Sequence, residues 1–115
     1  MYCLMMLHET ISKIEAKLQN AGSIKEEQRG ELLQLLSTLK REITTLSHTQ
    51  GEKAQSIAGF TEVSAHEATR EEKNPELLKL SLQGLSSSVE GFEKSHPELV
   101  ALVNRIATTL SNMGI

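Results

Sequence analysis

The side chains of this 115-residue chain best suited to metal binding or proton transfer near neutral pH are four histidines: His8, His48, His66 and His96. Two histidines on one helix bind the same metal ion when they are four residues apart, because that spacing puts both on one face. His66 is followed by Glu67, but Arg70 stands where the second histidine would be. His96 precedes Pro97, and we interpret it as a residue that shapes a turn. We therefore predict no metal site. A metal- or small-ligand-binding bundle that uses His66, Glu67 and His96 is the alternative.

Carboxylates and hydroxyls do not form a recognisable catalytic set. General acid-base catalysis needs carboxylates desolvated in a pocket, whereas the pairs Glu26-Glu27 and Glu71-Glu72 fall on helix faces predicted to be solvated. Ser86-Ser87-Ser88 has no nearby base and no G-x-S-x-G turn. The lone cysteine, Cys3, is interpreted as an inert terminal residue. We predict that the protein is not an enzyme and needs no cofactor.

Composition argues against two classes of partner. The net charge is −3, no basic run exceeds Lys40-Arg41, and aromatic residues make up only 3% of the chain. Nucleic-acid binders need clustered cations and, for single strands, stacking platforms, so no nucleic-acid partner is expected.

The apolar start, residues 1–7, is too short for a signal or membrane segment. With one cysteine, the chain suits a reducing compartment, and we expect a cytoplasmic protein. Met1, Met5 or Met6 could each be the true start.

Four segments carry apolar residues spaced alternately by three and four, which places five side chains on one stripe of a helix. The stripes are Leu4–Leu18, Leu32–Leu46, Leu78–Phe92 and Leu99–Met113, and the neighbours Leu35, Leu77 and Leu102 widen them. The pattern predicts one all-α domain over residues 1–115. Antiparallel helical hairpins pack there as a small bundle of four to five helices, over about 3–20, 24–47, 53–72, 75–94 and 97–113.

Capping residues support these boundaries. Gly22 favours a left-handed stop after the first helix, and Ser23 with Glu26 forms a predicted capping box. Asn74 before Pro75 is a typical N-cap followed by proline at the first helical position. A second predicted capping box, Ser95 with Glu98, surrounds Pro97, which forbids continuation of the preceding helix.

The segment 53–72 has the least regular apolar face, since its alanines share one side while Phe60 and Val63 lie off it. In the next helix a stripe of small residues lies beside the apolar one: Ser81, Gly84, Ser88 and Gly91. Mid-helix glycines are unfavourable. We therefore predict that this stripe packs closely on the alanine face of 54–68; the other reading is an exposed, tolerated face.

The chain from His66 onward resembles a family of short bacterial proteins known as a domain of unknown function. The resemblance rests on His66–Arg70, Val89–Glu93, Ser95–Val100 and the ending Leu110–Ile115, above all on the Phe-Glu-x-x-His-Pro joint and the Asn-x-Gly-Ile end. It implies a bacterial, cytoplasmic, helical protein. It implies no activity and no catalytic residues.

Absent a catalytic motif, the heptad-like stripes favour a protein that acts by binding. We predict self-association, with a homodimer preferred, and a possible further protein partner. The candidate contact or joint residues are His66, Arg70, Phe92, His96 and Asn104. Asn104, on the last predicted helix, could bond across an interface or simply solvate the surface.

Overall fold

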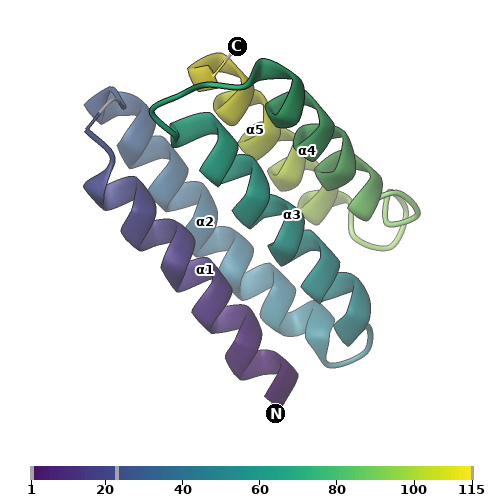
Figure 1. The fold of residues 1–115 in the computed structure, drawn as a ribbon. Coiled ribbons are helices and arrows are strands. Elements are labelled where there is room, and N and C mark those ends of the chain that lie inside the picture. The colour runs from purple at the N-terminus through teal and green to yellow at the C-terminus, as the bar shows by residue number, and fades with distance from the viewer. Residues whose placement is uncertain (1, 23, 115) are drawn as a thin grey trace.

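The computed structural model describes residues 2–22 and 24–114, with side chains described for 6–22 and 24–113. The regular elements of these residues are five helices: α1 (Tyr2–Asn20), α2 (Glu26–Ser47), α3 (Gly51–Thr69), α4 (Pro75–Ser88) and α5 (Pro97–Gly114). The predicted fold class, a small all-α bundle of antiparallel hairpins, is confirmed (Figure 1). Predictions that concern Met1, Ser23, or the side chains of Cys3, Leu4 and Met5 lie outside the described residues.

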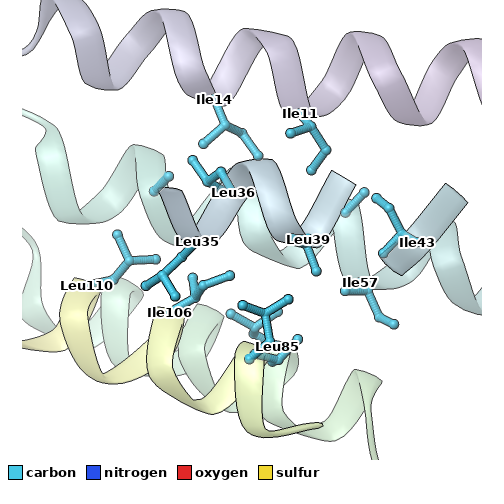
Figure 2. Close-up of a cluster of buried hydrophobic side chains, with 14 of the residues drawn as sticks. Ile11, Ile14, Leu35, Leu36, Leu39, Ile43, Ile57, Leu85, Ile106 and Leu110 are labelled. Atoms are coloured by element: carbon cyan, nitrogen blue, oxygen red, sulfur yellow. The ribbon is translucent and has the colours of Figure 1, made fainter. Parts of the chain in front are cut away.

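The apolar stripes form the core. Figure 2 shows Ile11 and Ile14 of α1 directed at α2, with Ile14 beside Leu36, while Leu35 points toward Leu110 and Ile106 of α5. Ile11, Leu39, Ile43, Ile57, Leu85, Val103 and Ile106 are fully buried. Each such side chain contributes about 1.5–3 kcal/mol by leaving water, so this aliphatic core is the main source of stability. Leu77 departs from the prediction, because it is 43% exposed rather than part of the buried stripe.

The helices lie in two layers, with α1, α3 and α4 side by side over α2 and α5 (Figure 1). Helix α3 contacts all four other helices. Its buried residues are mostly small, and include Ala54, Ala58, Ser64, Ala65 and Ala68. Small side chains let several neighbours approach one helix closely, which spreads the buried face over a wide arc and explains the irregular sequence pattern. The segment whose apolar face was least regular in sequence is thus the centre of the bundle.

The α1–α2 turn closes differently from the prediction. Helix α2 begins at Glu26, two residues later than expected, after Lys25, which makes no side-chain cap. Gly22 has no positive φ. The C-terminal carbonyls of α1 are instead satisfied by Arg29, which donates from Nε to the Leu18 carbonyl at 3.0 Å and from Nη2 to the Ala21 carbonyl. A side chain from the next helix thus replaces the left-handed glycine.

The prediction that the fourth helix runs to residue 94 is wrong, because α4 ends at Ser88. Gly91 adopts φ +94°, and its N–H donates to a Glu93 carboxylate oxygen at 2.8 Å. The apolar rhythm continues past the helix end, since Val89 and Phe92 are still buried. Periodicity marked burial correctly here, but a turn can bury the same side chains.

Two predicted caps have different outcomes. Asn74 caps α4, with its side-chain oxygen accepting from the Leu77 N–H at 3.1 Å and Pro75 following at the first turn. Helix α5 begins at Pro97, so His96 and not Ser95 directly precedes it. The Ser95 hydroxyl is hydrogen-bonded to His96 Nδ1 at 2.9 Å. The predicted Ser95 capping box is therefore one residue out of register.

The small-residue stripe of α4 does face α3, which is its closest neighbour. Gly84, however, lies under the ring of Phe60: a Cβ at this position would overlap the ring. Gly91 lies outside the helix and has open space around it. The surface of α3 that packs against the small-residue stripe of α4 therefore includes the Phe60 ring as well as alanines.

No helix in the described part of the chain has the length and hydropathy needed to cross a membrane.

Candidate interaction surface

The residues singled out from sequence fall into three separate places. His66 and Arg70 lie at the C-terminal end of α3, Phe92 and His96 in the α4–α5 connection, and Asn104 on the exposed side of α5. The structure does not bring them into one site, so each is described with its own neighbours.

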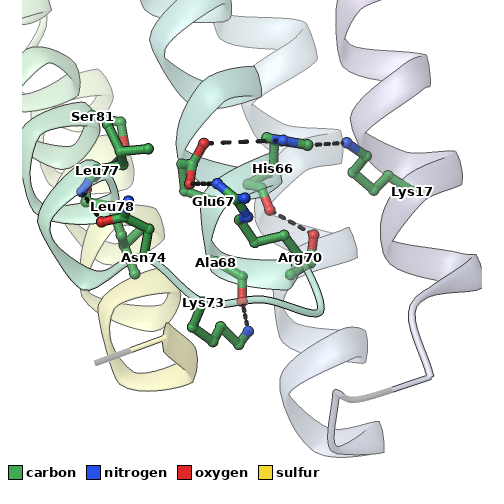
Figure 3. Close-up of polar contacts among 12 residues, drawn as sticks. Lys17, His66, Glu67, Ala68, Arg70, Lys73, Asn74, Leu77, Leu78 and Ser81 are labelled. Atoms are coloured by element: carbon green, nitrogen blue, oxygen red, sulfur yellow. Dashed lines mark hydrogen bonds and ion pairs between the residues drawn. The ribbon is translucent and has the colours of Figure 1, made fainter.

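The end of α3 holds a chain of polar contacts that reaches α1 (Figure 3). Lys17 Nζ of α1 lies 2.7 Å from His66 Nδ1, and His66 Nε2 lies 4.0 Å from a Glu67 carboxylate oxygen. Arg70 Nη1 donates to Glu67 at 3.0 Å. Glu67 is only 8% exposed, and a buried carboxylate requires a partner of this kind. The cluster therefore ties the end of α3 to its surroundings.

The α4–α5 connection is held by aromatic contacts. The rings of Phe92 and His96 meet edge to face at a centroid distance of 5.3 Å. Lys53 Nζ, from the start of α3, lies 5.2 Å from the centre of the Phe92 ring, within cation–π range. His96 therefore acts in this structure as part of a packed turn, and the turn is attached to the N-terminal end of α3.

These two clusters occupy opposite ends of α3, because Lys53 and His66 are separated by about 20 Å of helix. His66, Glu67 and His96 consequently do not converge, contrary to the alternative that used them as one ligand set. Within the part of the chain that the structure describes, no group of three or more His, Cys, Asp or Glu side chains is placed to hold a metal ion.

The hollows of the surface are shallow. A groove of about 830 Å³ runs between α4 and α5, where Lys79, Gln83, Ser86, Ser87 and Ser111 are among its lining residues. Asn104 lies in a smaller groove of about 240 Å³ with Glu31 and Arg105. In the part of the chain that the structure describes, the Ser64 hydroxyl is buried without a hydrogen-bond partner, and Ser64 lines neither groove. Among the described residues, therefore, neither groove contains a buried hydroxyl that lacks a hydrogen-bond partner.

A surface that sequence reasoning missed lies on the α3–α4 pair. Four large apolar side chains are exposed there: Phe60 (41%), Val63 (46%), Leu77 (43%) and Leu80 (56%). The contact between Phe60 and Gly84 shows that these stretches of α3 and α4 are adjacent, and the spacing 60–63 and 77–80 puts each pair on one helix face. We call these four residues the α3–α4 apolar surface. The available signal was that Phe60, Val63 and Leu80 fall outside the predicted stripes, whereas Leu77 was assigned to a stripe and is exposed.

Residues 60–115 match the family model described as Domain of unknown function (DUF4404). The match confirms the resemblance to an uncharacterised family over this stretch, which includes the second half of α3, all of α4 and all of α5. No curated protein and no solved structure shows a significant match to the chain.

Proposed function

Because the family matched by residues 60–115 carries no described activity, we propose a function from the surface itself: the protein is a non-enzymatic bundle that binds protein through its α3–α4 apolar surface. The observation that carries the proposal is the clustering of Phe60, Val63, Leu77 and Leu80 on one pair of helices. Grouped exposed apolar side chains mark interaction sites far more often than scattered ones do.

The energetics favour a covered surface. Burying one such side chain fully is worth about 1.5–3 kcal/mol relative to leaving it in water, and each of the four is between 41% and 56% exposed. Aromatic side chains such as that of Phe60 are enriched in the cores of protein–protein interfaces. The surrounding helix positions are polar or charged, such as Glu62, Glu76 and Lys79, which matches the polar rim of an interface.

We propose a non-enzymatic role because the side chains best suited to chemistry make structural contacts instead. His66 and Arg70 join polar contacts at one helix end, and His96 packs on Phe92 at the other. We also place the protein in a reducing cytoplasm, without a nucleic-acid partner, on the strength of its single cysteine and its net charge of −3. The family resemblance supports a bacterial source.

Site-specific photo-cross-linking in the native cell tests the binding surface. A photoreactive phenylalanine analogue at Leu80 should give discrete protein adducts on irradiation. The same analogue at Ala101, an exposed residue of α5 in the other layer, should not. Val63→Glu should abolish the Leu80 adducts, because a charge would have to be desolvated at the contact. Equal labelling at both positions, or none at Leu80, would refute the proposal.

A further inference from the structure

We propose that a second copy of this chain covers the α3–α4 apolar surface, with the two α3 helices antiparallel across a two-fold axis level with Thr61. The inference rests on the proposed function, because it names the partner of that same surface. The supporting observation is the order of residues along the outer side of α3. When two such helices run in opposite directions, the residues of one are complementary to the residues of the other.

The outer side of α3 carries residues spaced 4-3-4-3, and Arg70 follows four positions later, directly after the helix. We call these six residues the α3 outer stripe: Glu52, Ser56, Gly59, Val63, His66 and Arg70. The spacing keeps the five helical residues on one face. Four of them are exposed, and Gly59 and Arg70 are half-buried. The stripe borders the α3–α4 apolar surface and shares Val63 with it.

The stripe matches itself when one copy is reversed. With the axis at the level of Thr61, Glu52 of one copy lies opposite Arg70 of the other, and Ser56 lies opposite His66. A carboxylate at one end and a guanidinium at the other thus make an oppositely charged pair twice in the same dimer. The helix dipoles of antiparallel α3 helices add to this, since positive and negative helix ends alternate.

The centre of the stripe provides the steric fit. In the same register Gly59 of one copy lies opposite Val63 of the other. A Cβ added at Gly59 would meet nothing within 4 Å in the monomer, so no contact inside the chain requires glycine here. Mid-helix glycine costs about 1 kcal/mol relative to alanine. In the proposed dimer, the missing side chain of Gly59 leaves room for Val63 of the second copy, which explains why glycine occurs here.

The available area suits a dimer of ordinary size. The two longer extents of the molecule are 37 and 24 Å, so a broad face can supply the roughly 800 Å² per partner that stable interfaces bury. A two-fold contact uses the same patch on both copies, which places the eight side chains of the two α3–α4 apolar surfaces at or beside the interface.

Light scattering and sedimentation velocity of the full chain test the partner and the surface. We expect a dimer at tens of micromolar. Val63→Glu should raise the dimer dissociation constant at least about 100-fold by forcing desolvation of a charge. The control Ala101→Glu adds the same charge on the other layer and should leave it unchanged. Circular dichroism of both variants, with wild-type helicity, keeps the comparison free of folding defects.

Disulfide cross-linking tests the register. In a Cys3→Ser background, Gly59→Cys and Val63→Cys chains should cross-link about tenfold faster when mixed than either does alone, because only the mixed pair has its Cα atoms within disulfide reach. A dimer that Val63→Glu disrupts, but whose cross-linking is no faster in the mixture, would overturn the antiparallel register.

The outcomes separate this inference from the proposed function. A wild-type chain that stays strictly monomeric at tens of micromolar overturns the second copy as partner. If Leu80 adducts in the cell then contain another protein, the binding function still stands. A dimer that is insensitive to Val63→Glu overturns the α3–α4 apolar surface as the dimer contact, whereas the Leu80 adducts in the cell decide the binding function separately.

Discussion

At the scale of single residues, the side chain of one arginine replaces the left-handed glycine that was expected to cap the C-terminal end of α1. The Arg29 side chain is 13% exposed and donates to two carbonyls at the end of α1, while its Nη1 also meets the Glu26 carboxylate. Gly22 does not adopt the expected left-handed conformation, because these carbonyls already have a donor. The local sequence does not predict the contact of Arg29 with these carbonyls, since the contact depends on where α2 lies against α1.

Arg29→Ala should destabilise the protein by about 1–3 kcal/mol, because it leaves partly buried carbonyls without a donor. The matched control is Arg41→Ala in the same helix, whose guanidinium lies only 3.4 Å from an exposed Thr38 hydroxyl. It should change stability by less than about 0.5 kcal/mol. Urea unfolding at one fixed protein concentration measures both variants, and an equal loss in the two would contradict the capping role.

The Asn74 cap is a residue-scale feature that sequence did predict. Asn74→Ala should lower the free energy of unfolding by about 1 kcal/mol, since the Leu77 N–H loses its acceptor. Asn74→Asp keeps an acceptor at the same position and should retain most of the wild-type stability. A denaturant midpoint for Asn74→Asp as low as that for Asn74→Ala would count against the cap.

At the scale of elements, two glycines with open surroundings should respond in opposite directions. Gly91 holds φ +94° after the end of α4, whereas Gly30 lies on the exposed side of α2, and an added Cβ meets nothing at either position. Space is therefore equal, and backbone conformation alone differs.

Gly91→Ala should cost about 1 kcal/mol or more, because an L residue is strained at this φ. Gly30→Ala should stabilise by about 1 kcal/mol through helix propensity. Thermal unfolding of the two single variants gives both signs. A stabilising Gly91→Ala would mean that the turn after α4 does not need the left-handed conformation.

The packing of α4 on α3 predicts an energetic coupling between Gly84 and Phe60. Gly84→Ala gains helix propensity but displaces the Phe60 ring. In a Phe60→Ala background the displacement vanishes, and the same change should stabilise by about 1 kcal/mol. A double-mutant cycle, run in the Val63→Glu background to hold the association state constant, should show non-additivity of at least about 0.5 kcal/mol. Additive effects would place Phe60 away from Gly84.

At the scale of the whole molecule, the central position of α3 decides how the chain holds together. It contacts all four other helices, and the family match begins at residue 60, inside this helix. The matched stretch therefore lacks the first half of α3 and every core residue that α1 and α2 supply.

A fragment of residues 60–115 should be mostly unfolded at 25 °C. Its 56 residues are near the lower size limit for an independent core, and Leu85, Ile106 and Leu110 would lose the α2 side chains that cover them in Figure 2. The far-ultraviolet circular dichroism signal per residue should fall to less than half that of the full chain. A cooperative unfolding transition of the fragment would show that the α3–α5 part folds independently.

The order of residues was sufficient to predict the helical class, the buried stripes, the Asn74 cap and the resemblance of the C-terminal stretch to an uncharacterised family. These depend on local spacing and local hydrogen bonds, which the order of residues specifies directly. The packing of the helices, by contrast, was needed to show that α4 ends at Ser88, that α3 is central, and that His66 and His96 are far apart. It also exposed Leu77, Leu80, Phe60 and Val63 together. The physical reason is that a helix face is hidden or open only relative to its neighbours, and residues some twenty positions apart become one surface only when α3 and α4 pack.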